Sequence, residues 1–217
     1  MSEPIPDVFY YFPSPVYVVK CPQFLETVKE VSKEYFPEKQ QDMNEIYPVK
    51  MSGNFYLDPR LEDFCRYIGE TAWSILLSQG YNVENLMTKF TEMWVQEHHK
   101  HSLMEQHVHG LGAQIVGVYF LETPENCSKL IFHDPKAAKV QIGLPEIDQN
   151  TISTASNMVS FNPEEGLLVF TNSWLPHSFG RHASDDPIRF VHFNMNVQYV
   201  PPVPSLTPEC TPQAEII

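Results

Sequence analysis

The chain has 217 residues, 42% of them hydrophobic, and a formal net charge of −13. This length suits one globular domain with a sizeable core, so residues 1–217 are treated as a single domain. No apolar run is long enough to cross a bilayer, the N-terminus lacks the pattern of a signal peptide, and an acidic surface disfavours nucleic acid. We therefore expect a cytoplasmic protein whose four scattered cysteines are free thiols.

The first part of the chain, residues 1–90, is predicted to supply an N-terminal strand and supporting helices. Aromatic and β-branched residues over 8–20 predict one or two early strands, broken by proline. Apolar residues recur at helical spacing over 22–36 and again over 58–80. The intervening stretch, 39–54, is expected to be a long loop.

Beyond residue 90 the hydrophobic period changes to about two. The short strands predicted from it cover 90–98, 114–123, 129–134, 139–144, 157–162, 166–172 and 188–200. Many short strands separated by turn residues are typical of an antiparallel sandwich or barrel. We therefore expect an α+β, mainly β protein, with a core over 91–200 and the N-terminal helices packed outside it. The proline-rich tail, 201–217, cannot form a core helix or a central strand.

Five of the nine histidines lie between residues 98 and 109. On a strand, residues i and i+2 point to one face, so His107 and His109 can converge on one metal ion while Val108 faces into the sheet. A third ligand must come from elsewhere, and His177, at the end of a later predicted strand, is the first candidate. Asp134 is an alternative, because carboxylates are common third ligands, although its place before a proline predicts a turn.

The remaining histidines are given other roles. His98, His99 and His101 are expected in a solvated loop. His133 and His192 are expected to support the ligands or to face outward.

Arg189 follows His177 by twelve residues and opens the last predicted strand. A guanidinium group binds a carboxylate through two parallel hydrogen bonds, so an arginine near the metal would suit an anionic co-substrate.

These motifs together resemble a family of 2-oxoglutarate- and Fe(II)-dependent oxygenases. The resemblance is carried by Trp94, the H-x-H of 107–109, VGVYFLETPENCSKLIFHDP (116–135), PEEGLLVFTNSWLPH (163–177) and RFVHFN (189–194). It covers about half of the chain and extends to members from marine bacteriophages, which would place the protein in the host cytoplasm. The family's proline after the second histidine is glycine here, and its SGVYY strand is VGVYF.

The resemblance implies a double-stranded β-helix, or jelly roll, with Fe(II) inside and 2-oxoglutarate as co-substrate. His107 and His177 would be metal ligands, and His109 would take the place of the usual carboxylate. Arg189 would hold the distal carboxylate of 2-oxoglutarate, and Tyr119 could hydrogen-bond the same group.

A third neutral imidazole leaves the site one negative charge short of the usual two-histidine, one-carboxylate triad. Glu105 or Asp134 would restore that charge by reaching the metal. Glu105 could instead accept a hydrogen bond that orients a ligand imidazole.

The implied activity is hydroxylation of an unknown substrate with release of succinate and CO2. One alternative is a three-histidine dioxygenase of the cupin type, which works without 2-oxoglutarate and has no need of Arg189. Another is a non-catalytic jelly-roll module for binding or assembly. Trp94 and Trp174 could line the substrate entrance, and 39–57 or the tail could form a lid or a homodimer contact.

Overall fold

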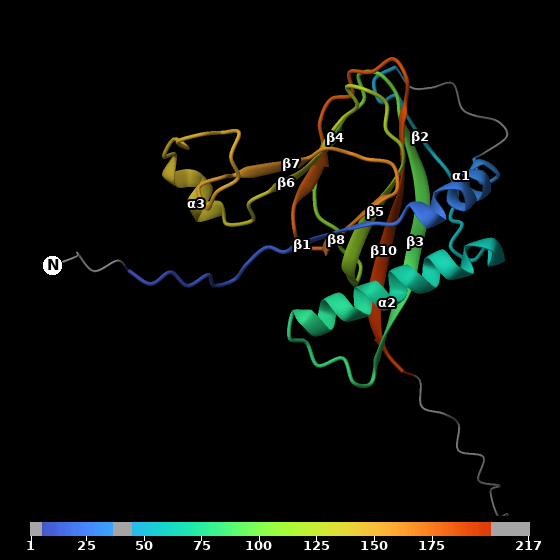
Figure 1. The fold of residues 1–217 in the computed structure, drawn as a ribbon, viewed down its shortest axis with the longest axis horizontal. Coiled ribbons are helices and arrows are strands. Elements are labelled where there is room, and N and C mark those ends of the chain that lie inside the picture. The colour runs from blue at the N-terminus through green and yellow to red at the C-terminus, as the bar shows by residue number, and fades with distance from the viewer. Residues whose placement is uncertain (1–5, 37–44, 201–217) are drawn as a thin grey trace, which may run out of the picture.

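The computed structural model describes residues 6–36 and 45–200, and the predictions for the tail lie outside the described residues. Two antiparallel sheets face each other (Figure 1). The larger contains, in spatial order, β1 (Val16–Lys20), β8 (Leu167–Asn172), β5 (Ala113–Glu122), β10 (Ile188–Tyr199), β3 (Leu86–His98) and β2 (Val49–Met51). The smaller contains β4 (Met104–His107), β9 (His177–Phe179), β6 (Leu130–His133) and β7 (Met158–Phe161). The predicted fold class is confirmed.

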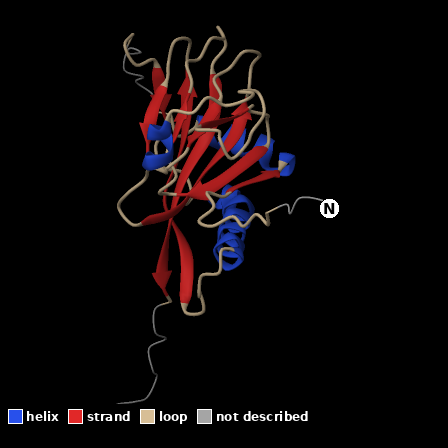
Figure 2. Cartoon of the chain, turned by 90° about the vertical axis from the view of Figure 1, so that its left-hand side faces the viewer, coloured by secondary structure: helices blue, strands red, loops and turns tan. Residues whose placement is uncertain are grey.

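Two helices cover the outer face of the larger sheet, where α2 crosses β10 and β3 (Figures 1 and 2). Both predicted helices are present, α1 at Leu25–Lys33 and α2 at Glu62–Ser78, each after one 3-10 turn, Pro22–Phe24 or Pro59–Leu61. Asp58 caps the second turn by accepting the backbone N–H of Arg60. No described helix is long and apolar enough to span a membrane.

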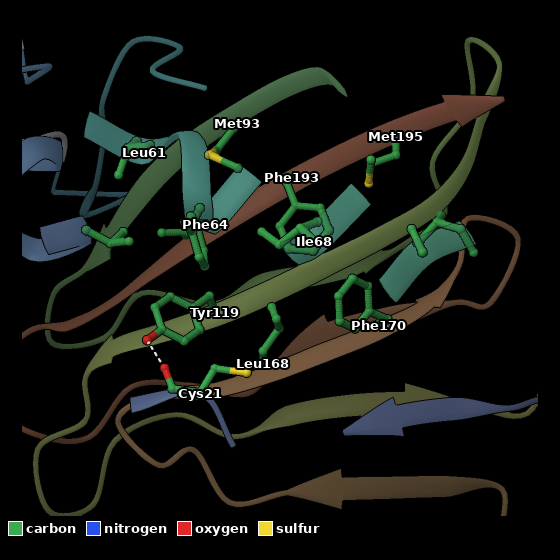
Figure 3. Packing of buried hydrophobic residues seen from close by; sticks show 14 of the residues in the cluster. Cys21, Leu61, Phe64, Ile68, Met93, Tyr119, Leu168, Phe170, Phe193 and Met195 are labelled. Atoms are coloured by element: carbon green, nitrogen blue, oxygen red, sulfur yellow. Dashed lines mark hydrogen bonds between the residues drawn. The ribbon is translucent and has the colours of Figure 1, made fainter. Parts of the chain in front are cut away.

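The helices and the larger sheet enclose the outer core, in which Phe64 and Ile68 of α2 pack with Phe193 of β10 (Figure 3). Gly117 of β5 makes this packing possible. A Cβ atom at position 117 would stand 2.1 Å from the Phe193 ring, so only glycine allows the ring to cross the strand there.

The two sheets enclose a second, inner core between them. It contains Phe120, Phe179 and Phe190, all of them buried. Along β10, residues 191, 193 and 195 belong to the outer core and residues 188 and 190 to the inner core. This alternation decides which side chains of β10 can reach a site between the sheets.

Three predictions about elements are wrong. The stretch 139–144 lies largely in a short helix, α3 (Ala137–Ile142), which ends at a left-handed Gly143. β2 lies within the stretch expected to be a loop, whereas β1 confirms one early strand within 8–20. The short strand β9 was missed, because three residues are too few to show a period of two, whereas β4 agrees with the strand expected at His107.

Candidate metal centre

The site lies where β4 meets β9. His107, the last residue of β4, is paired with His177, the first residue of β9. His109 lies two residues beyond β4, where its backbone N–H donates to the carbonyl of Ser173 at 2.9 Å. The Nε2 atoms of His109 and His177 are 3.3 Å apart, and one ring nitrogen of each histidine lies within 4.8 Å of the others. Within the described ranges, this is the only cluster of three or more side chains that could hold a metal ion.

Backbone carbonyls orient two of the three rings. The Nδ1 atom of His107 lies 2.8 Å from the carbonyl oxygen of Glu105, and that of His177 lies 3.0 Å from the carbonyl oxygen of Leu175. An Nδ1–H that donates to a carbonyl leaves Nε2 with a free lone pair. Both rings are thus prepared to present Nε2 to a cation, and the donor set fits a divalent metal such as Fe(II) or Zn(II).

Burial keeps the imidazoles of His109 and His177 neutral. Burial, helped by the neighbouring His107, lowers the pKa of His109 and of His177 to about 4 each. Only a neutral imidazole binds a metal, so these rings are in the ligating form at neutral pH.

The structure does not bring Arg189 to this centre, which corrects the role predicted for it. Its Nε donates to Glu97 Oε2 at 2.5 Å, and its Nη1 donates to both carboxylate oxygens of Glu122 at 3.0 and 3.1 Å. The reason is the alternation along β10, since odd-numbered residues there face the helices and even-numbered ones face the smaller sheet.

Tyr119 also lies on the outer face, so its predicted contact with a co-substrate is wrong. The side chain is fully buried in the outer core, 5.0 Å from the ring of Phe64. Its hydroxyl donates to the carbonyl oxygen of Cys21 at 2.7 Å (Figure 3). Burial raises its pKa well above the ordinary value.

Neither carboxylate proposed as an additional ligand joins the three histidines. Asp134 accepts hydrogen bonds from the Lys139 ammonium group at 2.7 Å and from the backbone N–H of Lys136 at 2.9 Å. The Glu105 side chain is exposed, and this residue orients His107 through its carbonyl oxygen instead. Val108 does not face into the sheet, because it is 53% exposed.

Two residues that the sequence analysis left with open roles border the centre. His192 is buried on the inner face of β10, with its ring stacked 4.8 Å from the ring of His109. Trp94 lies opposite it on β3. His98, expected in a solvated loop, is fully buried as the last residue of β3. The sequence signal that indicates a strand with two buried faces here is the alternation of Trp94 and His98 with the apolar Met93 and Val95.

Comparison with known proteins gives one family match and several solved structures with a similar fold. Residues 92–194 match the sequence model of a family described as "Putative 2OG-Fe(II) oxygenase". No curated protein matches the chain. Among solved structures, an oxidoreductase of the 2OG-Fe(II) oxygenase family from Burkholderia pseudomallei has 9% identity and a TM-score of 0.58, over 83% of this chain and 84% of that one. The fold is the double-stranded β-helix of these oxygenases.

Two further structures are similar. A prolyl-4-hydroxylase from Pseudomonas putida has 10% identity and a TM-score of 0.55, over 84% of this chain and 93% of that one. HygX from Streptomyces hygroscopicus, solved with nickel, 2-oxoglutarate and hygromycin B, has 12% identity and a TM-score of 0.52, over 84% and 83%. These likenesses establish the fold. With the family match they support an oxygenase whose histidine triad could bind iron.

Proposed function

We propose that this protein is a 2-oxoglutarate- and Fe(II)-dependent oxygenase that hydroxylates its substrate. The observation that carries the proposal is the convergence of His107, His109 and His177, with ring nitrogens within 4.8 Å, inside the fold shared with such enzymes. When bound, Fe(II) and 2-oxoglutarate supply the oxidising chemistry, in which O2 hydroxylates a C–H bond while succinate and CO2 are released.

The chain's own residues hold and shield that chemistry. The three imidazoles would bind one face of the ion and leave the other face to co-substrate and O2. The carbonyl oxygens of Glu105 and Leu175 keep two of the rings in the ligating orientation. His177 is 2% exposed, and the inner core beneath it excludes water from the reacting atoms.

The test measures succinate formed from 2-oxoglutarate by untagged protein supplied with Fe(II). We expect turnover that His177→Ala abolishes. A panel of substrates that stimulate this turnover begins with prolyl peptides and aminoglycosides, because similar structures are named as prolyl hydroxylases or contain hygromycin B. An iron-loaded protein that converts no 2-oxoglutarate with any of them contradicts the proposal.

A second candidate is a three-histidine dioxygenase that works without 2-oxoglutarate. Its support is the position of the basic side chains. Every lysine and arginine on the described strands is exposed or paired with a carboxylate, namely Lys20, Lys50, Lys89 and Arg189. Consumption of O2 by the iron-loaded protein with a substrate but no oxo acid would favour this candidate.

A further inference from the structure

Two exposed apolar segments lie beside β1 and β7, which are edge strands of the two sheets. The first is residues 8–12, which we call the N-terminal arm, and the second is the β6–β7 insertion, residues 134–157, which contains α3. Both extend from the same side of the two sheets (Figure 1), and together they line a cavity of about 690 Å³. No backbone hydrogen bond joins the arm to the rest of the described chain.

The side chains of both segments are mainly apolar and point into solvent. Four consecutive aromatic side chains of the arm are 72–87% exposed, namely Phe9, Tyr10, Tyr11 and Phe12. Four aliphatic side chains of the insertion are at least 65% exposed, namely Ile142, Leu144, Ile147 and Ile152. The cavities beside these two sets share three lining residues, Lys139, Ser153 and Asn157, so the sets form one continuous surface. We call these eight side chains the apolar face.

The apolar face is larger than a monomer usually exposes. At roughly 150–250 Å² for each aromatic side chain, the four rings of the arm alone leave about 500–700 Å² in solvent. The largest apolar patch on a typical monomer is about 300–600 Å², whereas a stable interface buries about 800 Å² on each partner. With the four aliphatic side chains added, the apolar face has the area that a stable dimer needs.

The apolar face also largely lacks the acidic charge of the rest of the chain. Residues 8–19 and 149–163 contain no charged side chain. Residues 134–148 carry two lysines and three carboxylates, so their charges nearly cancel. With a net charge of −13, two copies of this chain repel each other over most of their surface, and here that repulsion is weakest. A centre depleted of charged residues is also typical of protein interfaces.

The apolar face carries both a projecting arm and cavities that can receive one. In a two-fold symmetric contact a surface meets itself, so one contact can place each arm against the other copy's cavities. This self-complementarity favours a second copy of the chain as the partner.

We propose that two copies of this chain form a dimer through the apolar face, with the N-terminal arm of each copy lying against the β6–β7 insertion of the other. The contact differs from the two that the sequence suggested, residues 39–57 and the tail. It goes beyond the proposed function and does not depend on it.

The test is sedimentation equilibrium of the full chain, whose monomer has a mass of 25.0 kDa. We expect the wild-type protein to be a dimer that dissociates on dilution. Tyr11→Asp in the arm and Ile147→Asp in the insertion each place a charge in the contact, and each should raise the dissociation constant of the dimer by more than about 30-fold. Both side chains are exposed in the single chain, so the fold should be kept, which circular dichroism checks.

Leu57→Asp is the matched control, because Leu57 is equally exposed but lies in the stretch 39–57, outside the apolar face. This variant should form the dimer as the wild-type protein does. A wild-type monomer at every concentration, a dimer that survives in both face variants, or equal dissociation in Leu57→Asp overturns the proposal. A wild-type monomer that co-sediments with phosphatidylcholine vesicles also overturns it and assigns the apolar face to a lipid surface.

Discussion

Polar side chains on the two faces of the larger sheet differ in whether they have hydrogen-bond partners within the protein. On the outer face, Arg189 is bonded to both Glu97 and Glu122, and the Tyr119 hydroxyl is bonded to a backbone carbonyl. On the inner face, His192 and Trp94 are buried without partners among the described residues. The outer-face groups are thus paired within the protein, whereas the inner face carries the three histidines that could hold a metal ion. Function should therefore depend on the inner face and stability on the outer one.

The largest effect should come from removing a metal ligand on the inner side. His177→Ala is expected to weaken binding of Ni(II) or Zn(II) by more than about 100-fold, since losing even a residue that only orients a ligand costs about 10–100-fold. Calorimetric titration of the metal-free protein measures this. His101→Gln, an exposed change outside the cluster, is the control. Equal affinities for the two variants would remove His177 from the metal centre.

The largest loss of stability should come from the outer core. In Gly117→Ala the new Cβ would stand 2.1 Å from the Phe193 ring and 2.7 Å from the carbonyl oxygen of Val169, so the ring and the strand must both shift. We expect a loss of about 3 kcal/mol in the free energy of unfolding, measured in urea. Gly110→Ala, whose Cβ meets no atom within 4 Å, is the control. If both variants lose the same amount, the packing around position 117 is not as described.

A substitution of Arg189 is the most direct test of the difference between the two faces. Arg189→Gln should lower the free energy of unfolding by about 1–2 kcal/mol, because Glu97 is 5% exposed and loses a charged partner while keeping Lys50 and His99. Affinity for Ni(II) should not change. The measurements are urea denaturation and metal titration of the same preparation. A loss of metal affinity without a loss of stability would assign Arg189 to the inner site after all.

Acid should destabilise the metal-free protein through the inner face. His109 and His177 have folded-state pKa values of about 4, below the ordinary 6.5, so the unfolded chain binds protons first as pH falls. Their contribution to stability is complete above pH 6.5 and is lost as pH falls through about 4. Calorimetric Tm values at pH 7, 5.5 and 4.5 should decrease in that order. The decrease should be shallower in His177→Phe, and an equal slope would contradict this origin.

The smallest effect should be that of Glu105→Gln. The carboxylate is exposed, and His107 is oriented by the backbone carbonyl, which the substitution leaves in place. Metal affinity should change by less than about twofold, well below the 10–100-fold typical of a lost orienting partner. A larger loss in the same titration would show that the carboxylate reaches the ion.

Local patterns predicted much of the fold. Both long helices and most of the longer strands were identified, because each contains enough residues for its period to be seen. The interpretation of 139–144 as a strand was wrong because six residues fit either period. The three histidines were chosen correctly as a group that meets, although His109 lies beyond the end of β4 rather than on the strand with His107.

The main error concerned which side chains of β10 point to the inner face of the larger sheet. Arg189 and His192 are three residues apart, so they lie on opposite faces of a strand, and the sequence alone does not say which face is inside. The expected Arg189 contact was wrong, and the structure selected the first of the two roles left open for His192, beside the ligands. Pairing of β10 with both β3 and β5 fixed the answer.

The sequence by itself determined the longer helices and strands, the acidic surface and the supply of imidazoles, because composition and period are local properties. Tertiary structure alone decided which imidazoles meet and which basic side chain is excluded from them. The physical reason is that a strand alternates its faces whatever its neighbours are, and only the packing of one sheet against another selects the face that becomes the interior.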